Sequence, residues 1–258
     1  MDTYHQLVKS EIHLIAAALA YSSLLSLIPF LALTLAIFQM IGGLEFLYPK
    51  VQFLFLDYFK TTAGTEASLV AKKIFDRIQA KTLGTSAAII LFFTSWRLLH
   101  DIEAGIQKMW SKNSPRPLVK RIFLSWLLIL IFPLFLAIYV SFRSLDAIIP
   151  FFKANTPMID FIVAILGLFL IYKIIPDAKV RNRAALSGAL FAAIGIAALK
   201  ASFTYLAKGA FSLNKIYGSL AAIPLLLFWI LLLWYIVLFG VLVCSSVQKN
   251  TENPEFID

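Results

Sequence analysis

The sequence predicts an all-α integral membrane protein, a bundle of six transmembrane helices. Composition is the first observation: 60% of the 258 residues are apolar and 14% are charged, whereas soluble domains have about 45–50% apolar and about 25% charged residues. The second is an uncharged run of 30 residues, 14–43, which exceeds the roughly 20 residues that cross a bilayer core. The third is that further apolar runs recur along the chain.

These runs predict one polytopic domain over residues 1–258. The six expected spans cover about 14–42, 83–99, 122–141, 159–175, 184–206 and 220–247. The first run is too long for the apolar part of a cleavable signal peptide, so we expect it to be retained. The second and fourth spans are the least apolar, because Arg97, Asp160 and Lys173 lie near their ends.

The distribution of Lys and Arg predicts cytoplasmic termini. With an even number of spans, both termini lie on one side of the membrane. The short connections on that side carry ten Lys and Arg residues, and those on the other side carry five. Cytoplasmic loops are enriched in Lys and Arg, so the termini are expected in the cytoplasm. The net charge of +9 also predicts contact with anionic lipid headgroups.

The segment 44–82 is too long for a simple turn between the first two spans. In its second half Val70, Ile74 and Ile78 recur at the spacing of one helical face. We therefore expect amphipathic helices between spans one and two. They either lie in the membrane interface or form a lid over an outward-facing cavity.

Prolines predict that three spans are interrupted. Pro29, Pro133 and Pro224 lie inside the first, third and sixth expected spans. Each removes one backbone hydrogen bond and frees the carbonyl group four residues earlier. Ser26 and Ser219 lie beside two of these points. Such breaks supply polar backbone for transporter sites, although a proline kink can also serve packing alone.

Charged residues inside or beside the spans predict ion pairs. A charged side chain at the centre of a transmembrane helix costs about 3 kcal/mol on insertion scales. Asp160 and Lys200 are expected near the same membrane boundary, where they can pair. Arg97 and Asp101 are four residues apart and can pair along one helix. The alternative for each cation is that its side chain reaches the headgroups.

The inventory of reactive residues is poor for catalysis, so no enzymatic activity is expected. Cys244 is the single cysteine, and the three histidines are not spaced as metal ligands. The chain has no phosphate-binding glycine loop and no serine nucleophile elbow. Its basic tracts lack the interleaved aromatic residues of a single-strand binding surface. We expect no metal, no cofactor and no nucleic-acid partner.

Several stretches along the chain carry a family signature. They are ALAYSSLLSLIP at 18–29, GIQKMW at 105–110, YKIIP at 172–176, VRNRAALSGA at 180–189 and IYGSLAAIP at 216–224, followed by Trp229 and by LFG at 238–240. Together they resemble the YihY/BrkB family of inner-membrane proteins, many of which are labelled ribonuclease BN. The chain reads Gly240-Val241-Leu242 where family members often have Gly-Ala-Glu, so any role for that carboxylate is absent.

The resemblance covers most of the chain and implies a six-helix protein of the bacterial inner membrane with cytoplasmic termini. It also implies a role in envelope integrity or in lipid or lipopolysaccharide handling. The ribonuclease label is generally regarded as a misassignment, which agrees with the absence of a recognisable catalytic set.

We therefore expect an inner-membrane transporter for an anionic lipid or another envelope component. The expected substrate-binding residues are Ser26, Pro29, Lys173, Arg181, Arg183, Tyr217, Gly218, Ser219 and Pro224. Two alternatives stay open. One is a scaffold that binds lipids or envelope proteins and transports nothing. The other is an ion-coupled exchanger of small solutes, which needs a buried carboxylate, for which Asp160 is the candidate within the spans.

Small residues in the fifth span predict close helix packing. Gly188 and Gly195, with Ala184 and Ala192 nearby, would let another helix approach closely. That helix belongs either to the same chain or to a second copy in a homo-oligomer. The remaining expected partners are anionic membrane lipids.

Overall fold

The chain is described here from a computed structural model. The structure describes residues 11–26, 85–110, 156–217 and 222–252, together with the single or paired residues 29, 49–50, 52–53, 56, 68–69, 72, 135 and 138–139. Within these residues the regular structure is entirely helical. The elements are an N-terminal helix Glu11–Ser26, α3 (Thr85–Met109), α6 (Thr156–Ile174), α7 (Asn182–Tyr217) and α8 (Ala222–Glu252).

Three helices are long and apolar enough to cross a membrane. The qualifying segments are Pro157–Ile174 of α6, Asn182–Ser202 of α7 and Leu226–Lys249 of α8. They agree with the fourth, fifth and sixth expected spans. The described N-terminal helix is apolar but shorter than a full span. The predicted total of six spans is therefore not confirmed.

The described residues include parts of the other predicted spans. The second, expected at 83–99, is α3, which continues as a helix to Met109. Of the third, expected at 122–141, residues 135 and 138–139 are described, and they are helical. Eight residues of the segment 44–82 are described and are also helical. The predicted amphipathic helices, like Pro133, otherwise lie outside the described residues.

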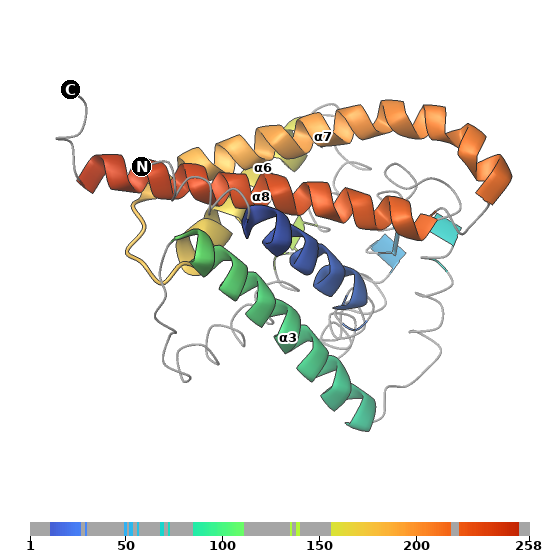
Figure 1. The fold of residues 1–258 in the computed structure, drawn as a ribbon, viewed down its shortest axis with the longest axis horizontal. Helices are drawn as coiled ribbons and strands as arrows, with labels where there is room; N and C mark the ends of the chain where they lie inside the picture. The colour runs from blue at the N-terminus through green and yellow to red at the C-terminus, as the bar shows by residue number, and fades with distance from the viewer. Residues whose placement is uncertain are drawn as a thin grey trace.

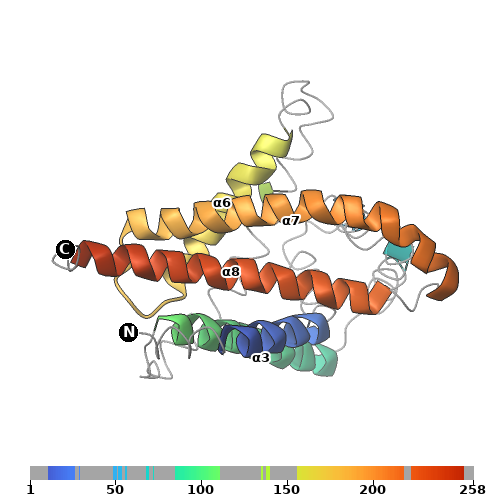
Figure 2. The same ribbon diagram turned by 45° about the horizontal axis from the view of Figure 1, so that its top comes forward.

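The helices form a bundle built around α7 and α8, which lie antiparallel and side by side (Figures 1 and 2). α6 packs on α7, and α3 contacts α8 on its other side. The N-terminal helix lies against both α3 and α8, as Figure 2 shows. The start of the N-terminal helix, the ends of α3 and α8 and the α6–α7 connection gather at one end of the molecule (Figure 1). We call this the connection end.

Small residues form the α7 side of the core where these helices meet. The buried face of α7 consists largely of alanine: Ala184, Ala185, Ala189, Ala192 and Ala193. On α6, by contrast, several large apolar side chains point outward: Met158, Ile162 and Leu166. Small residues let helix backbones approach closely, and lipid favours large apolar side chains on the outside. This distribution is the one expected for a membrane bundle.

The prolines do not all interrupt helices as predicted. Pro224 lies in the first turn of α8, which begins at Ala222. Since the first residues of a helix have no intrahelical acceptor for their N–H groups, a proline there breaks no hydrogen bond. Within the described part of α8, Pro224 therefore interrupts no helical hydrogen bond. Pro29 is helical and half-buried.

Candidate functional site

The connection end carries the largest group of predicted site residues. α6 ends at Ile174 and α7 begins at Asn182, so Lys173, Arg181 and Arg183 lie at the ends of two apolar spans. All three side chains are exposed, as is that of Lys179 between them. We call these four residues the basic collar.

Contacts with α6 and α7 orient Lys173. Its Nζ atom donates a hydrogen bond to Oδ1 of Asn182, the first residue of α7. The same Nζ atom lies 5.6 Å from the centroid of the Phe169 ring. Both contacts keep the ammonium group at the junction of the two helices.

A glutamine from α8 holds the connection that carries the collar. The Arg181 backbone N–H donates to Oε1 of Gln248 over 3.0 Å, and Nε2 of Gln248 donates to the Lys179 carbonyl over 3.4 Å. The Gln248 side chain is 5% exposed. A buried amide with a donor and an acceptor both engaged fixes the backbone on each side of residue 180.

The helices pack closely below the collar. Tyr172 is 1% exposed, and its hydroxyl donates to the Val237 carbonyl over 2.9 Å. Gly188 and Gly240 face each other, and a Cβ atom on Gly188 would lie 2.5 Å from the Gly240 carbonyl oxygen. The small residues of the fifth span therefore pack against α8 of the same chain.

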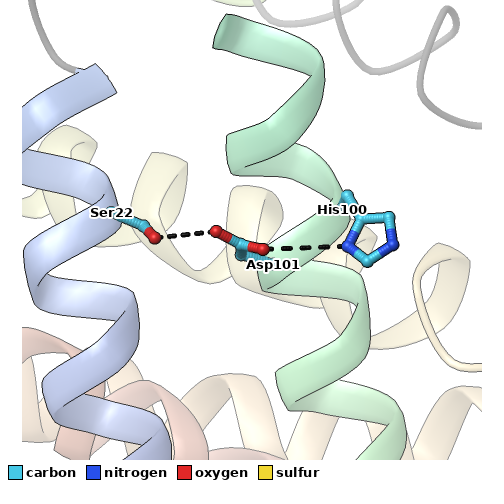
Figure 3. A network of polar contacts seen from close by, with 3 residues as sticks. All are labelled: Ser22, His100 and Asp101. Carbon is cyan, nitrogen blue, oxygen red and sulfur yellow. Dashed lines mark hydrogen bonds and ion pairs between the residues drawn. The ribbon is translucent and has the colours of Figure 1, made fainter.

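A second group of polar residues links the N-terminal helix to α3. Ser22 Oγ donates to Asp101 Oδ2 over 2.7 Å. The other carboxylate oxygen, Oδ1, lies 3.7 Å from Nδ1 of His100. Figure 3 shows Asp101 reaching from α3 toward Ser22, with His100 on the opposite side of the carboxylate. Arg97 makes no ion pair with Asp101 in the described part of the chain.

The same turns of α3 line a pocket of about 470 Å³. Its lining residues are Phe93, Trp96, Arg97, His100 and Asp101. The Phe93 and Trp96 rings are stacked, with centroids 6.2 Å apart and planes 19° apart. The pocket therefore has an aromatic half and a charged half.

Further polar contacts fasten the N-terminal helix to α3 and α8. Trp234 Nε1 donates to Ser23 Oγ over 2.9 Å, and the Tyr235 hydroxyl lies 2.6 Å from His13 Nδ1. Lys108 Nζ forms an ion pair with Glu11 over 3.2 Å. These contacts, with that of Ser22 and Asp101, form a polar seam between the N-terminal helix and its two neighbours.

A carboxylate is buried near the end of α3. Glu103 is 4% exposed, and its Oε1 atom accepts a hydrogen bond from Gln107 Nε2 over 2.8 Å. Glu103 lies beyond the predicted end of the second span, at residue 99, so its burial was not expected. The extension of α3 to Met109 brings this residue into the bundle.

The other predicted site residues lie far from the basic collar. Arg183 and Tyr217 stand 34 residues apart on the continuous helix α7, which corresponds to about 51 Å at about 1.5 Å per residue. Pro224 is exposed in the first turn of α8, and Ser26 is buried at the end of the N-terminal helix. Gly218 and Ser219 lie outside the described residues. The described residues of this group therefore do not join the basic collar.

Asp160 is engaged in a contact that the sequence did not suggest. Its Oδ1 atom accepts a hydrogen bond from the Tyr139 hydroxyl over 2.9 Å. Lys200 is exposed on α7, and its pairing with Asp160 stays a prediction. Among the residues with described positions, no group of three or more His, Cys, Asp and Glu side chains could hold a metal ion.

Sequence reasoning missed the partners of Gln248, Asp101 and Glu103. Gln248 and Asp101 bond to other helices, whereas Glu103 bonds to Gln107 one turn later on α3, a spacing that could have been found in the sequence. The other two pairs are far apart in sequence: Ser22 and Asp101 by 79 positions, and Arg181 and Gln248 by 67. Such separations leave no periodic pattern in the chain.

Comparisons with known proteins place the chain among membrane proteins. The family model described as Virulence factor BrkB matches residues 3–256. A UPF0761 membrane protein of Pseudoalteromonas translucida is 27% identical over 99% of this chain and 88% of its own length. A UPF0761 membrane protein of Alteromonas mediterranea is 27% identical over 96% of this chain and 86% of its own length. The match confirms the family resemblance predicted from the sequence motifs.

Some relatives are longer than this chain. A UPF0761 membrane protein of Chlorobium luteolum is 28% identical over 95% of this chain, which corresponds to 60% of the relative's length. No solved structure matches the chain.

Proposed function

The chain belongs to the Virulence factor BrkB family, and on that basis we propose that it transports an anionic lipid or another anionic envelope component across the bacterial inner membrane. The proposal includes no enzymatic step. One observation carries it: the exposed basic collar stands at the ends of two membrane spans, where lipid headgroups lie.

The collar suits a phosphate group for electrostatic reasons. Each Lys or Arg near an anionic membrane surface contributes about 1 kcal/mol of attraction. Arg181 and Arg183 flank the first residue of α7, where the helix dipole adds partial positive charge. The guanidinium groups can bind phosphate oxygens in pairs, and Lys173 adds a point charge.

The polar seam supports transport over simple binding. Ser22, Ser23 and His13 hold polar partners on α3 and α8, so polar atoms follow the N-terminal helix through the bundle. Polar groups inside membrane proteins are costly and commonly mark substrate or ion paths. A headgroup that leaves the collar could follow this seam while its acyl chains stay in lipid.

The test is transbilayer movement of a labelled phosphatidylglycerol in vesicles that contain the purified protein, with protein-free vesicles as the blank. We expect protein-dependent movement that the double variant Lys173→Ala/Arg183→Ala reduces at least about tenfold, the loss expected when charge-assisted contacts are removed. Lys200→Ala is the matched control, because it removes an exposed cation from the same α7 helix away from the collar.

Two outcomes would contradict the proposal. One is unchanged movement in a folded double variant, and the other is no movement with folded, inserted wild-type protein. The second outcome would favour the scaffold hypothesis, in which the collar binds lipid without moving it.

A second candidate function is ion-coupled exchange of small solutes, and the burial of Glu103 favours it. A carboxylate that is 4% exposed can couple proton or sodium binding to a change in the bundle. The expected result is a protein-dependent proton or sodium flux into vesicles that Glu103→Gln abolishes. Gln107→Leu, which keeps the carboxylate, serves as the control. Flux that persists in Glu103→Gln would contradict this function.

A further inference from the structure

The pocket on α3 is arranged along one face of the helix. Phe93, Trp96, Arg97, His100 and Asp101 follow the spacing of neighbouring helical positions. Their order along the chain is also an order of polarity, from the aromatic pair to the charged residues. Phe93 and Asp101 are separated by about 12 Å along the helix axis.

The polarity of the pocket increases toward the C-terminal end of α3. The end of α3 lies at the connection end of the molecule, together with the end of α8 (Figure 1). The charged half of the pocket therefore faces the connection end, and the aromatic half faces away from it. A lipid lying along α3 would place its headgroup on the charged half and its acyl chains on Phe93 and Trp96.

The charged half contains one cation and one carboxylate that are not paired with each other. Ser22 donates a hydrogen bond to one oxygen of the Asp101 carboxylate, and His100 lies beside the other (Figure 3). A carboxylate has about four acceptor positions, and His100 Nδ1 stands 3.7 Å from Oδ1, longer than a hydrogen bond. Asp101 thus keeps acceptor capacity for a ligand, and the exposed Arg97 side chain offers several donors.

We infer that this pocket binds a phospholipid whose headgroup carries both a phosphate and a primary ammonium group, as in phosphatidylethanolamine. Arg97 donates to the phosphate, Asp101 accepts from the ammonium, and Phe93 with Trp96 contacts the acyl chains. Arg97 and Asp101 are one turn apart, about 6 Å along the axis, which suits a headgroup with its two charges joined by a short spacer. Opposite charges in the lining favour a headgroup with no net charge over an anionic one.

The site is separate from the basic collar and does not rest on transport. A result that contradicts transport by the collar would therefore leave lipid binding in this pocket untouched, and the reverse also holds. A lipid in this pocket would be a bound constituent of the bundle, next to the Ser22–Asp101 contact that joins the N-terminal helix to α3.

Native mass spectrometry of the detergent-solubilised full chain tests the inference. Phosphatidylethanolamine, phosphatidylglycerol and phosphatidylcholine with identical acyl chains are added in turn, and retained lipid is counted. We expect wild-type protein to retain phosphatidylethanolamine about tenfold more strongly than either of the other lipids. Phosphatidylcholine has no ammonium hydrogen to donate. Arg97→Gln should weaken retention about tenfold, the effect of losing a charge-assisted hydrogen bond.

Asp101→Asn supplies the sharper result, because an asparagine oxygen can still accept from Ser22 and keep the helices together. It removes the negative charge and leaves Arg97 uncompensated, so the preference should shift from phosphatidylethanolamine to phosphatidylglycerol. Lys108→Gln is a change on α3 outside the pocket lining. This variant should keep the wild-type preference for phosphatidylethanolamine.

Three results would overturn the inference. One is a wild-type preference for phosphatidylglycerol, and another is unchanged selectivity in both folded variants. The third is equal binding of glycerophosphoethanolamine, which has the headgroup without acyl chains, because the ligand would then be a soluble aminoalkyl phosphate.

Discussion

At the scale of single residues, glycines allow a close contact between α7 and α8. Gly188 and Gly240 bring the two backbones together, and the Tyr172 side chain packs over this point from α6. The sequence predicted close packing at Gly188 but not its partner. A glycine in an apolar span indicates that another helix packs closely at that position. Which helix does so depends on the tertiary fold.

Gly188→Ala should destabilise the protein by about 1–3 kcal/mol, the usual cost of overpacking a core. The added methyl group would lie 2.5 Å from the Gly240 carbonyl oxygen and 2.8 Å from the Cys244 Cβ atom. Gly167→Ala on α6 is the control, since its methyl group would meet Phe135 at an ordinary 3.7 Å. Thermal unfolding in detergent gives the midpoint temperature of each variant. Equal midpoints would contradict the close packing at Gly188.

Tyr172→Phe should partly rescue Gly240→Ala. A Cβ atom on Gly240 would overlap the Tyr172 hydroxyl oxygen, so removing that oxygen makes room for the methyl group. Alone, Tyr172→Phe should cost about 0.6 kcal/mol, the average for a hydrogen bond between membrane helices. A double-mutant cycle of unfolding free energies gives the coupling. Strictly additive effects would show that the hydroxyl does not face Gly240.

At the scale of elements, apolar periodicity and length predicted α6, α7 and α8 well, because a span must be continuous and apolar. The lengths of α3 and α7 were less predictable. α7 runs for 36 residues, about 54 Å, well beyond the thickness of a bilayer core. α3 continues past its charged residues because Ser22, Gln107 and Glu11 give them partners. A hydropathy pattern carries no information about such partners.

The α6–α7 connection should depend on Gln248 for its order. Gln248→Leu removes both hydrogen bonds to the backbone at residues 179 and 181. Hydrogen exchange at the Arg181 amide should become faster by roughly fivefold to tenfold, as expected for one lost hydrogen bond.

Ser245→Ala is the control for that exchange measurement. The Ser245 hydroxyl donates to the Leu242 carbonyl of its own helix, so its loss leaves the connection unchanged. Equal exchange at Arg181 in Gln248→Leu and Ser245→Ala would mean that Gln248 does not hold the connection.

At the scale of the whole molecule, the connection end gathers the ends of α3 and α8 with the α6–α7 connection. Lys108, Lys173 and Lys249 lie in the last turns of α3, α6 and α8, where a cation also complements the helix dipole. The positive-inside rule then predicts a cytoplasmic location for this end. The sequence could supply the sign of the charge at each end of a span, but only the fold shows that these ends lie together.

Cysteine labelling in intact cells checks the orientation. In a Cys244→Ser background, Lys108→Cys, Lys179→Cys and Lys249→Cys should all resist a membrane-impermeant maleimide until the inner membrane is opened. Met158→Cys, near the start of α6, should react from the outside and is the internal control. Reaction of Lys179→Cys from the outside would reverse the orientation.

The central claim is that the basic collar binds an anionic lipid headgroup. Crosslinking tests it most directly. A phosphatidylglycerol with a photoreactive group on its headgroup would be irradiated with the protein in vesicles, and the crosslinked residues would be mapped by mass spectrometry. We predict crosslinks concentrated between Lys173 and Arg183, suppressed by excess phosphatidylglycerol and weakened in the double variant Lys173→Ala/Arg183→Ala. A phosphatidylcholine probe that gives the same map with the same yield would contradict the claim.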